Sequence, residues 1–161
     1  MLGDLLLRWT VRLALLAYAV FLLITAAGRA DRYGSLLRGL WLTAGVLFLL
    51  HTLCAFHFVH HWSHSHAVLH TAKRTEELLG WGFGGGVYFN YLFVALWLWE
   101  AARFWKTPVS YGVGFYLLHG YLLFIAINGA IIFETGPTRI AGMLTIAAVL
   151  LLWLSRLKHH V

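Results

Sequence analysis

Seven of the ten histidines in this 161-residue chain fall within a single window of twenty residues, and the window is the most distinctive chemical feature of the sequence. It reads HTLCAFHFVHHWSHSHAVLH and contains His51, His57, His60, His61, His64, His66 and His70. Imidazole is the commonest side-chain ligand of transition metals, and two imidazoles one helical turn apart can hold one ion. The window therefore predicts metal binding.

Helical geometry sorts these histidines, because residues three and four apart share a face. The first group is a stripe made of His57, His60, His61 and His64, and the second is the pair His66 and His70. We expect at least two rings of the stripe to turn inward and bind a metal ion with help from Glu134, which ends a later apolar segment on the same side. These ligand types suit Zn, Fe, Cu, Ni or Mn and do not choose among them. The alternative is a histidine-rich helix that only contacts the membrane surface.

Part of the stripe resembles a known motif. The residues from His57 to His61 read HFVHH, which resembles the HxxHH box of membrane di-iron fatty acid hydroxylases and desaturases. The resemblance covers five residues. Those families carry further histidine boxes on distant segments, whereas this chain has one box followed by the irregular tail HSHAVLH. The sequence thus has no complete catalytic motif, and whether it is an enzyme stays open.

A second pair of histidines lies deep within apolar segments. His51 and His119 are about 20 Å and 15 Å from the same expected membrane face at 1.5 Å per helical residue. Polar groups at this depth usually face a partner. The pair could ligate a b-type haem in an electron-transfer subunit, or each ring could hydrogen-bond inside the bundle. If the chain transports metal, His51, His119 and Asn128 would form the path across the bilayer.

The composition predicts an integral membrane protein. Hydrophobic residues make up 61% of the chain and charged residues only 11%, whereas soluble domains are nearer a half and a quarter. The net charge of +6 is spread among helix ends instead of forming a basic stripe. Lipid headgroups are therefore the expected partners, together with other membrane-complex subunits, and nucleic acid is not. A purely structural subunit of a larger membrane complex is a third functional class.

Five apolar stretches are long enough to cross a bilayer, which needs roughly 20 helical residues. They cover about 9–27, 40–62, 83–105, 109–133 and 140–157. The expected fold is an all-α bundle of about five transmembrane helices in a single membrane domain, 1–161. Near the inner end of the third stretch, Glu100 and Arg103 have the i,i+3 spacing of an ion pair.

The segment after the second stretch has unusual composition. From Val46 to Leu79 there is neither glycine nor proline. We expect the second helix to extend beyond the bilayer, or to bend into an interfacial helix, before the glycine-rich run at 80–86 ends it.

The distribution of basic residues predicts an orientation. With five spans, seven basic residues lie on one side and five on the other. The positive-inside rule then places the C-terminus in the cytoplasm, with the N-terminus and the histidine window outside the plasma membrane.

Overall fold

The computed structural model describes residues 2–106 and 113–159, and every regular element within them is a helix. The helices are α1 (Leu2–Ala26), α2 (Gly34–Phe58), α3 (His64–Leu79), α4 (Gly86–Lys106), α5 (Val113–Ile127), a π-helical turn η1 (Asn128–Ile132) and α6 (Pro137–His159). For these residues the predicted all-α class is confirmed. The expected start of the fourth stretch near Val109 lies outside the described residues.

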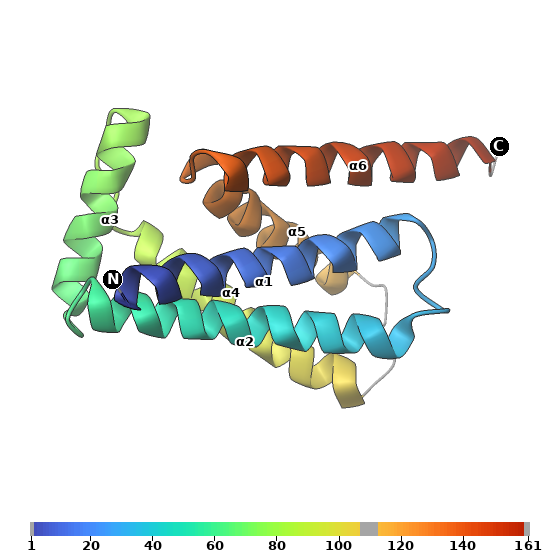
Figure 1. Cartoon of the computed structure of the whole chain (residues 1–161), viewed down its shortest axis with the longest axis horizontal. Coiled ribbons are helices and arrows are strands. Elements are labelled where there is room, and N and C mark those ends of the chain that lie inside the picture. The colour runs from blue at the N-terminus through green and yellow to red at the C-terminus, as the bar shows by residue number, and fades with distance from the viewer. Residues whose placement is uncertain (1, 107–112, 160–161) are drawn as a thin grey trace.

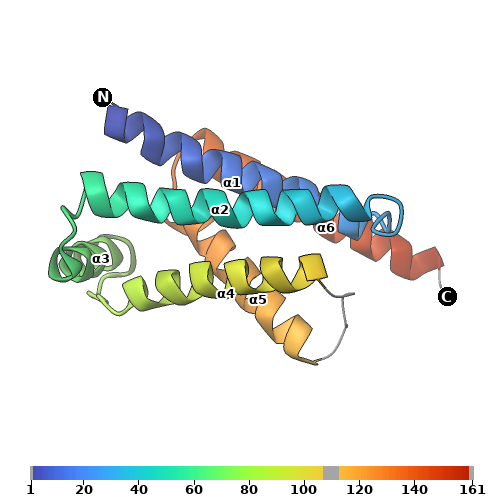
Figure 2. The same cartoon turned by 90° about the horizontal axis from the view of Figure 1, so that it is seen from below.

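The long helices form a bundle, and one short helix lies across its end. Helices α1, α2, α4 and α6 run along a common direction, while α5 is tilted against them (Figures 1 and 2). Helix α3 stands across the end at which α1 begins and α2 finishes (Figure 1). We call this the α3 end. It carries most of the histidine window.

Four helices of the described chain are long and apolar enough to cross a membrane. They are α1, α2, the combined stretch of α5 and η1 over Val113–Ile132, and α6 over Pro137–Arg156. Helix α4 has 21 residues, which is long enough, but polar side chains such as Asn90, Glu100 and Arg103 lower its apolar character. The expected five spans are therefore supported for four helices only.

The outward surface of the bundle is apolar, as lipid-facing surfaces are. Leu16, Leu117, Leu144 and Leu151 are each at least 60% exposed. A water-soluble monomer rarely exposes contiguous apolar surface of this kind. Together with the four apolar helices, this surface is consistent with a multi-pass membrane protein.

An aromatic cluster holds α1, α2 and α4 together. The indole rings of Trp41 and Trp97 stack with centroids 4.5 Å apart, and the ring of Tyr18 meets Trp97 edge-on at 4.8 Å. Trp97 is fully buried, and its Nε1 donates to the carbonyl oxygen of Trp41 at 2.9 Å. Gly45 makes the approach of α4 feasible, because a Cβ atom there would lie 2.7 Å from Trp97 Cδ1.

The expectation that the second helix continues unbroken past the membrane is wrong, and the alternative of a bend is found. Helix α2 ends at Phe58, and a turn over 59–63 leads into the separate helix α3. His61 and Trp62 adopt left-handed backbone angles, with φ of 50° and 59°, which end the helix without glycine. Ser63 then caps α3 by accepting a hydrogen bond from the backbone N–H of His66 at 3.2 Å. A serine N-cap is a recognised helix-start signal that the sequence analysis overlooked.

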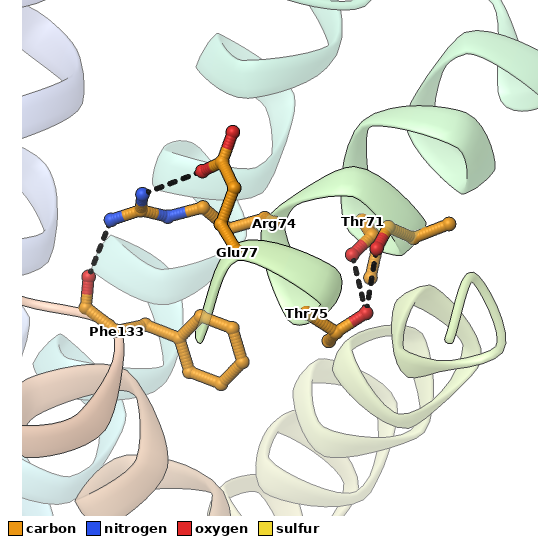
Figure 3. A network of polar contacts seen from close by, with 6 residues as sticks. Thr71, Arg74, Thr75, Glu77 and Phe133 are labelled. Carbon is orange, nitrogen blue, oxygen red and sulfur yellow. Dashed lines mark hydrogen bonds and ion pairs between the residues drawn. The ribbon is translucent and has the colours of Figure 1, made fainter. Parts of the chain in front are cut away.

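A hydrogen bond and close backbone contact connect α3 to the segment that precedes α4. The buried Thr75 hydroxyl accepts a hydrogen bond from the backbone N–H of Phe83 at 2.7 Å and donates to α3 carbonyls, including that of Thr71 (Figure 3). Gly84 lies so close to α3 that a Cβ atom would come within 2.8 Å of the Val68 carbonyl oxygen. The glycine-rich run is therefore required for close backbone approach as well as for ending the helix.

Candidate histidine site at the α3 end

The structure brings together three histidines that the sequence pattern had placed in two groups. His66 and His70 lie one turn apart on α3, and His60 lies in the turn that precedes α3. Because the chain turns over 59–63 so that α3 stands across the end of α2, His60 lies beside the first turns of α3 (Figure 1). The Nδ1 atoms of His60 and His66 are 3.4 Å apart, and the ring centroids of His60 and His70 are 5.2 Å apart.

The surroundings of His60 favour its neutral imidazole. Partial burial lowers the pKa of His60 below its usual value, and the neighbouring imidazolium charges of His70, His66 and His61 lower it further. A neutral imidazole has one ring nitrogen with a free lone pair, and that lone pair is what binds a metal ion. His60 therefore keeps its capacity as a ligand to lower pH than an isolated histidine does.

His64 leaves the predicted stripe and faces α4 instead. Its Nδ1 lies 3.1 Å from the hydroxyl of Tyr91, and its Nε2 lies 3.1 Å from the hydroxyl of Tyr88. At least two rings of the stripe were expected to turn inward and bind metal; His64 turns toward α4, but both of its nitrogens are engaged by tyrosines. These tyrosines were not among the residues expected at the site, although their i,i+3 spacing places them on one face of α4.

The remaining stripe residues do not join the cluster. His57 is exposed, and its Nδ1 accepts a hydrogen bond from the indole Nε1 of Trp62 at 3.2 Å. His61 is exposed on the left-handed turn. A continuous stripe of His57, His60, His61 and His64 would need helix through 64, and the helix ends before His60.

Glu134 lies near the opposite end of α3. Its neighbour Phe133 accepts a hydrogen bond from the guanidinium of Arg74 at 3.4 Å, and the same guanidinium pairs with Glu77 at 3.1 Å (Figure 3). Arg74 is eight residues, or about 12 Å along the helix, from His66. Glu134 is thus associated with the C-terminal half of α3, whereas the histidine cluster lies in the N-terminal half.

Within residues 2–106 and 113–159, no three side chains of His, Cys, Asp or Glu are arranged to hold a metal ion together. The predicted set of four histidines and Glu134 is therefore not assembled. Within the histidine window, the Nδ1 atoms of His60 and His66 bring two candidate ligand atoms to 3.4 Å.

The two deep histidines are not brought together either. His51 Nδ1 lies 3.0 Å from the carbonyl oxygen of Leu7 on α1. The His119 ring packs against Trp41, with centroids 5.0 Å apart. Trp41 and His51 are ten residues apart on α2, which is about 15 Å along the axis. A single haem or ion bound by both rings has no support in this arrangement.

The third member of the predicted transport path is also bonded elsewhere. Asn128 donates from Nδ2 to the Phe124 carbonyl oxygen of its own helix at 2.7 Å. The interactions of His51, His119 and Asn128 are thus made with three different parts of the bundle.

No protein-family model, curated protein or solved structure matches this chain. The chemistry of the α3 end is inferred from its own side chains.

Proposed function

We propose that this protein is a multi-pass membrane protein that captures a divalent transition-metal ion at the α3 end, with His60 and His66 as its protein ligands. The observation that carries the proposal is the 3.4 Å separation of their Nδ1 atoms. Two imidazole nitrogens bound to one tetrahedral zinc ion at about 2.0–2.1 Å lie about 3.3–3.4 Å apart. The pair therefore already has the spacing that one shared ion requires.

The same spacing allows a single proton to be shared between the two nitrogens as a hydrogen bond. A metal ion bound between the rings needs both Nδ1 lone pairs, so the shared proton moves to the Nε2 atom of its own ring, which stays neutral. Binding weakens as the pH falls, because an added proton on either ring takes up the lone pair that the ion needs. His70 is the nearest candidate for a third ligand, because its ring lies 5.2 Å from that of His60. Remaining coordination positions would be filled by water or by a molecule that delivers or accepts the ion, which suits a capture site better than a closed structural one.

In the membrane arrangement that we propose together with this site, α4 is a fifth membrane-spanning helix. Helix α4 lies alongside α2 in the bundle and has comparable length, and its polar groups Glu100 and Arg103 pair with each other (Figure 2). The described chain starts at the α3 end and finishes at the opposite end (Figure 1). With the positive-inside rule, the α3 end and its histidines face the outside of the plasma membrane.

Reporter fusions test this topology. A reporter that is active only in the cytoplasm should be active when fused after the C-terminus and inactive when inserted at Gly80, in the turn after α3. The physical reason is the excess of arginine and lysine at the end opposite α3. Both termini reporting the same side would show that α4 does not cross, and an inactive C-terminal fusion would reverse the orientation.

Metal titration tests the site. Purified protein in lipid nanodiscs should bind Zn²⁺, Co²⁺ or Ni²⁺ in calorimetry at pH 7.5, and binding should weaken at pH 5.5. His60→Ala and His66→Ala should each reduce the affinity by more than the roughly 10–100-fold that loss of a supporting group causes. His70→Ala should have a smaller effect.

His61→Asn is the matched control, because His61 neighbours the pair and asparagine tolerates the left-handed backbone found there. It should bind metal as the unaltered protein does. Unchanged affinity in both His60→Ala and His66→Ala would disprove the site, as would equal loss in His61→Asn.

A further inference from the structure

A cavity of about 400 Å³ lies between α1, the α5–η1 stretch and α6, away from the histidines. Its walls are mainly aliphatic side chains, with small residues such as Ala19, Ala141 and Gly142 that leave room. The volume falls within the range of sites that hold small molecules, about 300–1,000 Å³. The cavity therefore has the size and lining of a binding site for an apolar group.

The cavity exists because α6 packs loosely. Helix α6 contacts α1 and η1, yet no residue of its most apolar 18-residue window is buried within the protein. On the α1 side the lining runs from Arg12 to Leu22, ten residues or about 15 Å along the helix axis. An extended hydrocarbon chain lying parallel to the helices matches this elongated shape.

Among the described residues that line the cavity, one is charged, and it is the cation Arg12. Arg12 lies three residues inside the stretch 9–27 that is expected to cross the bilayer, where an arginine is costly unless it is paired. In the part of the chain that the structure describes, the interaction recorded for its guanidinium is with the Trp9 ring, 5.9 Å from the centroid. None of the described residues that line the cavity is an aspartate or a glutamate. An anion is the partner that complements this site, and Thr138 adds a hydroxyl to the lining.

We propose that this cavity binds an anionic phospholipid of the surrounding bilayer, with one acyl chain between α1 and α6 and the phosphate at Arg12. The aliphatic walls replace lipid contacts for the chain, and the guanidinium donates charge-assisted hydrogen bonds to the phosphate oxygens. Arg12 and Leu16 are both exposed at the edge of the cavity, so a lipid enters sideways from the bilayer. The bound lipid fills the gap that loose packing of α6 leaves, and so stabilises α6 on α1.

Thermal unfolding in nanodiscs of defined lipid tests the proposal. Replacing part of the phosphatidylcholine by phosphatidylglycerol with the same acyl chains should raise the melting temperature of the unaltered protein. Arg12→Gln should abolish this rise, because the phosphate loses its cation. Ala141→Phe should also abolish it, because the ring occupies the space of the acyl chain.

Two variants serve as matched controls. Arg139→Gln removes a cation of α6 that does not line the cavity, and Met143→Phe adds a ring to a position of α6 that is 53% exposed and outside the lining. Both variants should keep the rise in melting temperature that phosphatidylglycerol causes. Native mass spectrometry of detergent-solubilised protein should show retained phosphatidylglycerol in the unaltered protein and in both controls, and not in Arg12→Gln.

Three outcomes would overturn the proposal. The first is an equal melting temperature with both lipids, and the second is an undiminished rise in Arg12→Gln. The third is an equal rise when inorganic phosphate is added to phosphatidylcholine nanodiscs, which would show that a free anion suffices without an acyl chain.

Discussion

Replacing Gly45 by alanine is expected to destabilise the bundle by about 1–3 kcal/mol, the usual cost of overpacking a well-packed interior. The new Cβ atom would lie 2.7 Å from Trp97 Cδ1 and 3.2 Å from its Nε1. The indole cannot move away easily, because it is fully buried, stacked on Trp41 and hydrogen-bonded to the Trp41 carbonyl. Either α4 shifts away from α2 or the aromatic cluster loses its packing.

Gly39 provides the control on the same helix. A Cβ atom at Gly39 would meet nothing within 4 Å, so Gly39→Ala should leave stability unchanged or raise it by up to about 1 kcal/mol through helix propensity. The free energy of unfolding of both variants can be measured by denaturation in mixed micelles. If Gly45→Ala proves as stable as Gly39→Ala, the close approach of α2 and α4 is not present in the protein.

Replacing Glu100 by alanine is expected to cost about 2–3 kcal/mol of stability. Glu100 is 2% exposed and accepts two hydrogen bonds from Arg103, at 2.8 Å from Nε and 2.6 Å from Nη2. Losing one partner of a fully buried pair costs roughly 3–5 kcal/mol, because an uncompensated charge stays behind. The expected cost of Glu100→Ala is below this range, because the Arg103 side chain is 31% exposed and can turn toward polar surroundings.

The chain contains a second pair with the same spacing and the opposite environment. Arg74 and Glu77 also pair at i,i+3, but their side chains are 44% and 48% exposed. Glu77→Ala should therefore cost only about 0.3–0.5 kcal/mol, since solvent screens exposed pairs. Equal effects of Glu77→Ala and Glu100→Ala on the free energy of unfolding would contradict the buried setting of Glu100.

Local and compositional features of this protein could be predicted from the sequence, because they depend on neighbouring residues only. Continuous apolar runs give helices whatever surrounds them, and the runs of α1, α2, α5 and α6 are found as helices apolar enough to span a membrane. The pair of Glu100 and Arg103 was predicted from i,i+3 spacing and is confirmed. The stretch that forms α4 was also expected to cross the bilayer, but its polar residues lower its hydropathy, and it is not among the four described helices that are apolar enough to do so.

The arrangement of the histidines was decided by tertiary structure. Helical periodicity assumes one unbroken axis, and the turn over 59–63 ends that axis before His60. The turn separates His57 from the later histidines, sets His60 beside His66 and presents His64 to two tyrosines of α4. The separation of His51 and His119 was also decided by tertiary structure, since each ring points to a different helix interface and sequence depth alone does not specify the interface. Composition and periodicity thus determined which segments are apolar helices, whereas the turn between α2 and α3 decided which imidazoles meet, because contacts between side chains depend on the direction of the chain in space.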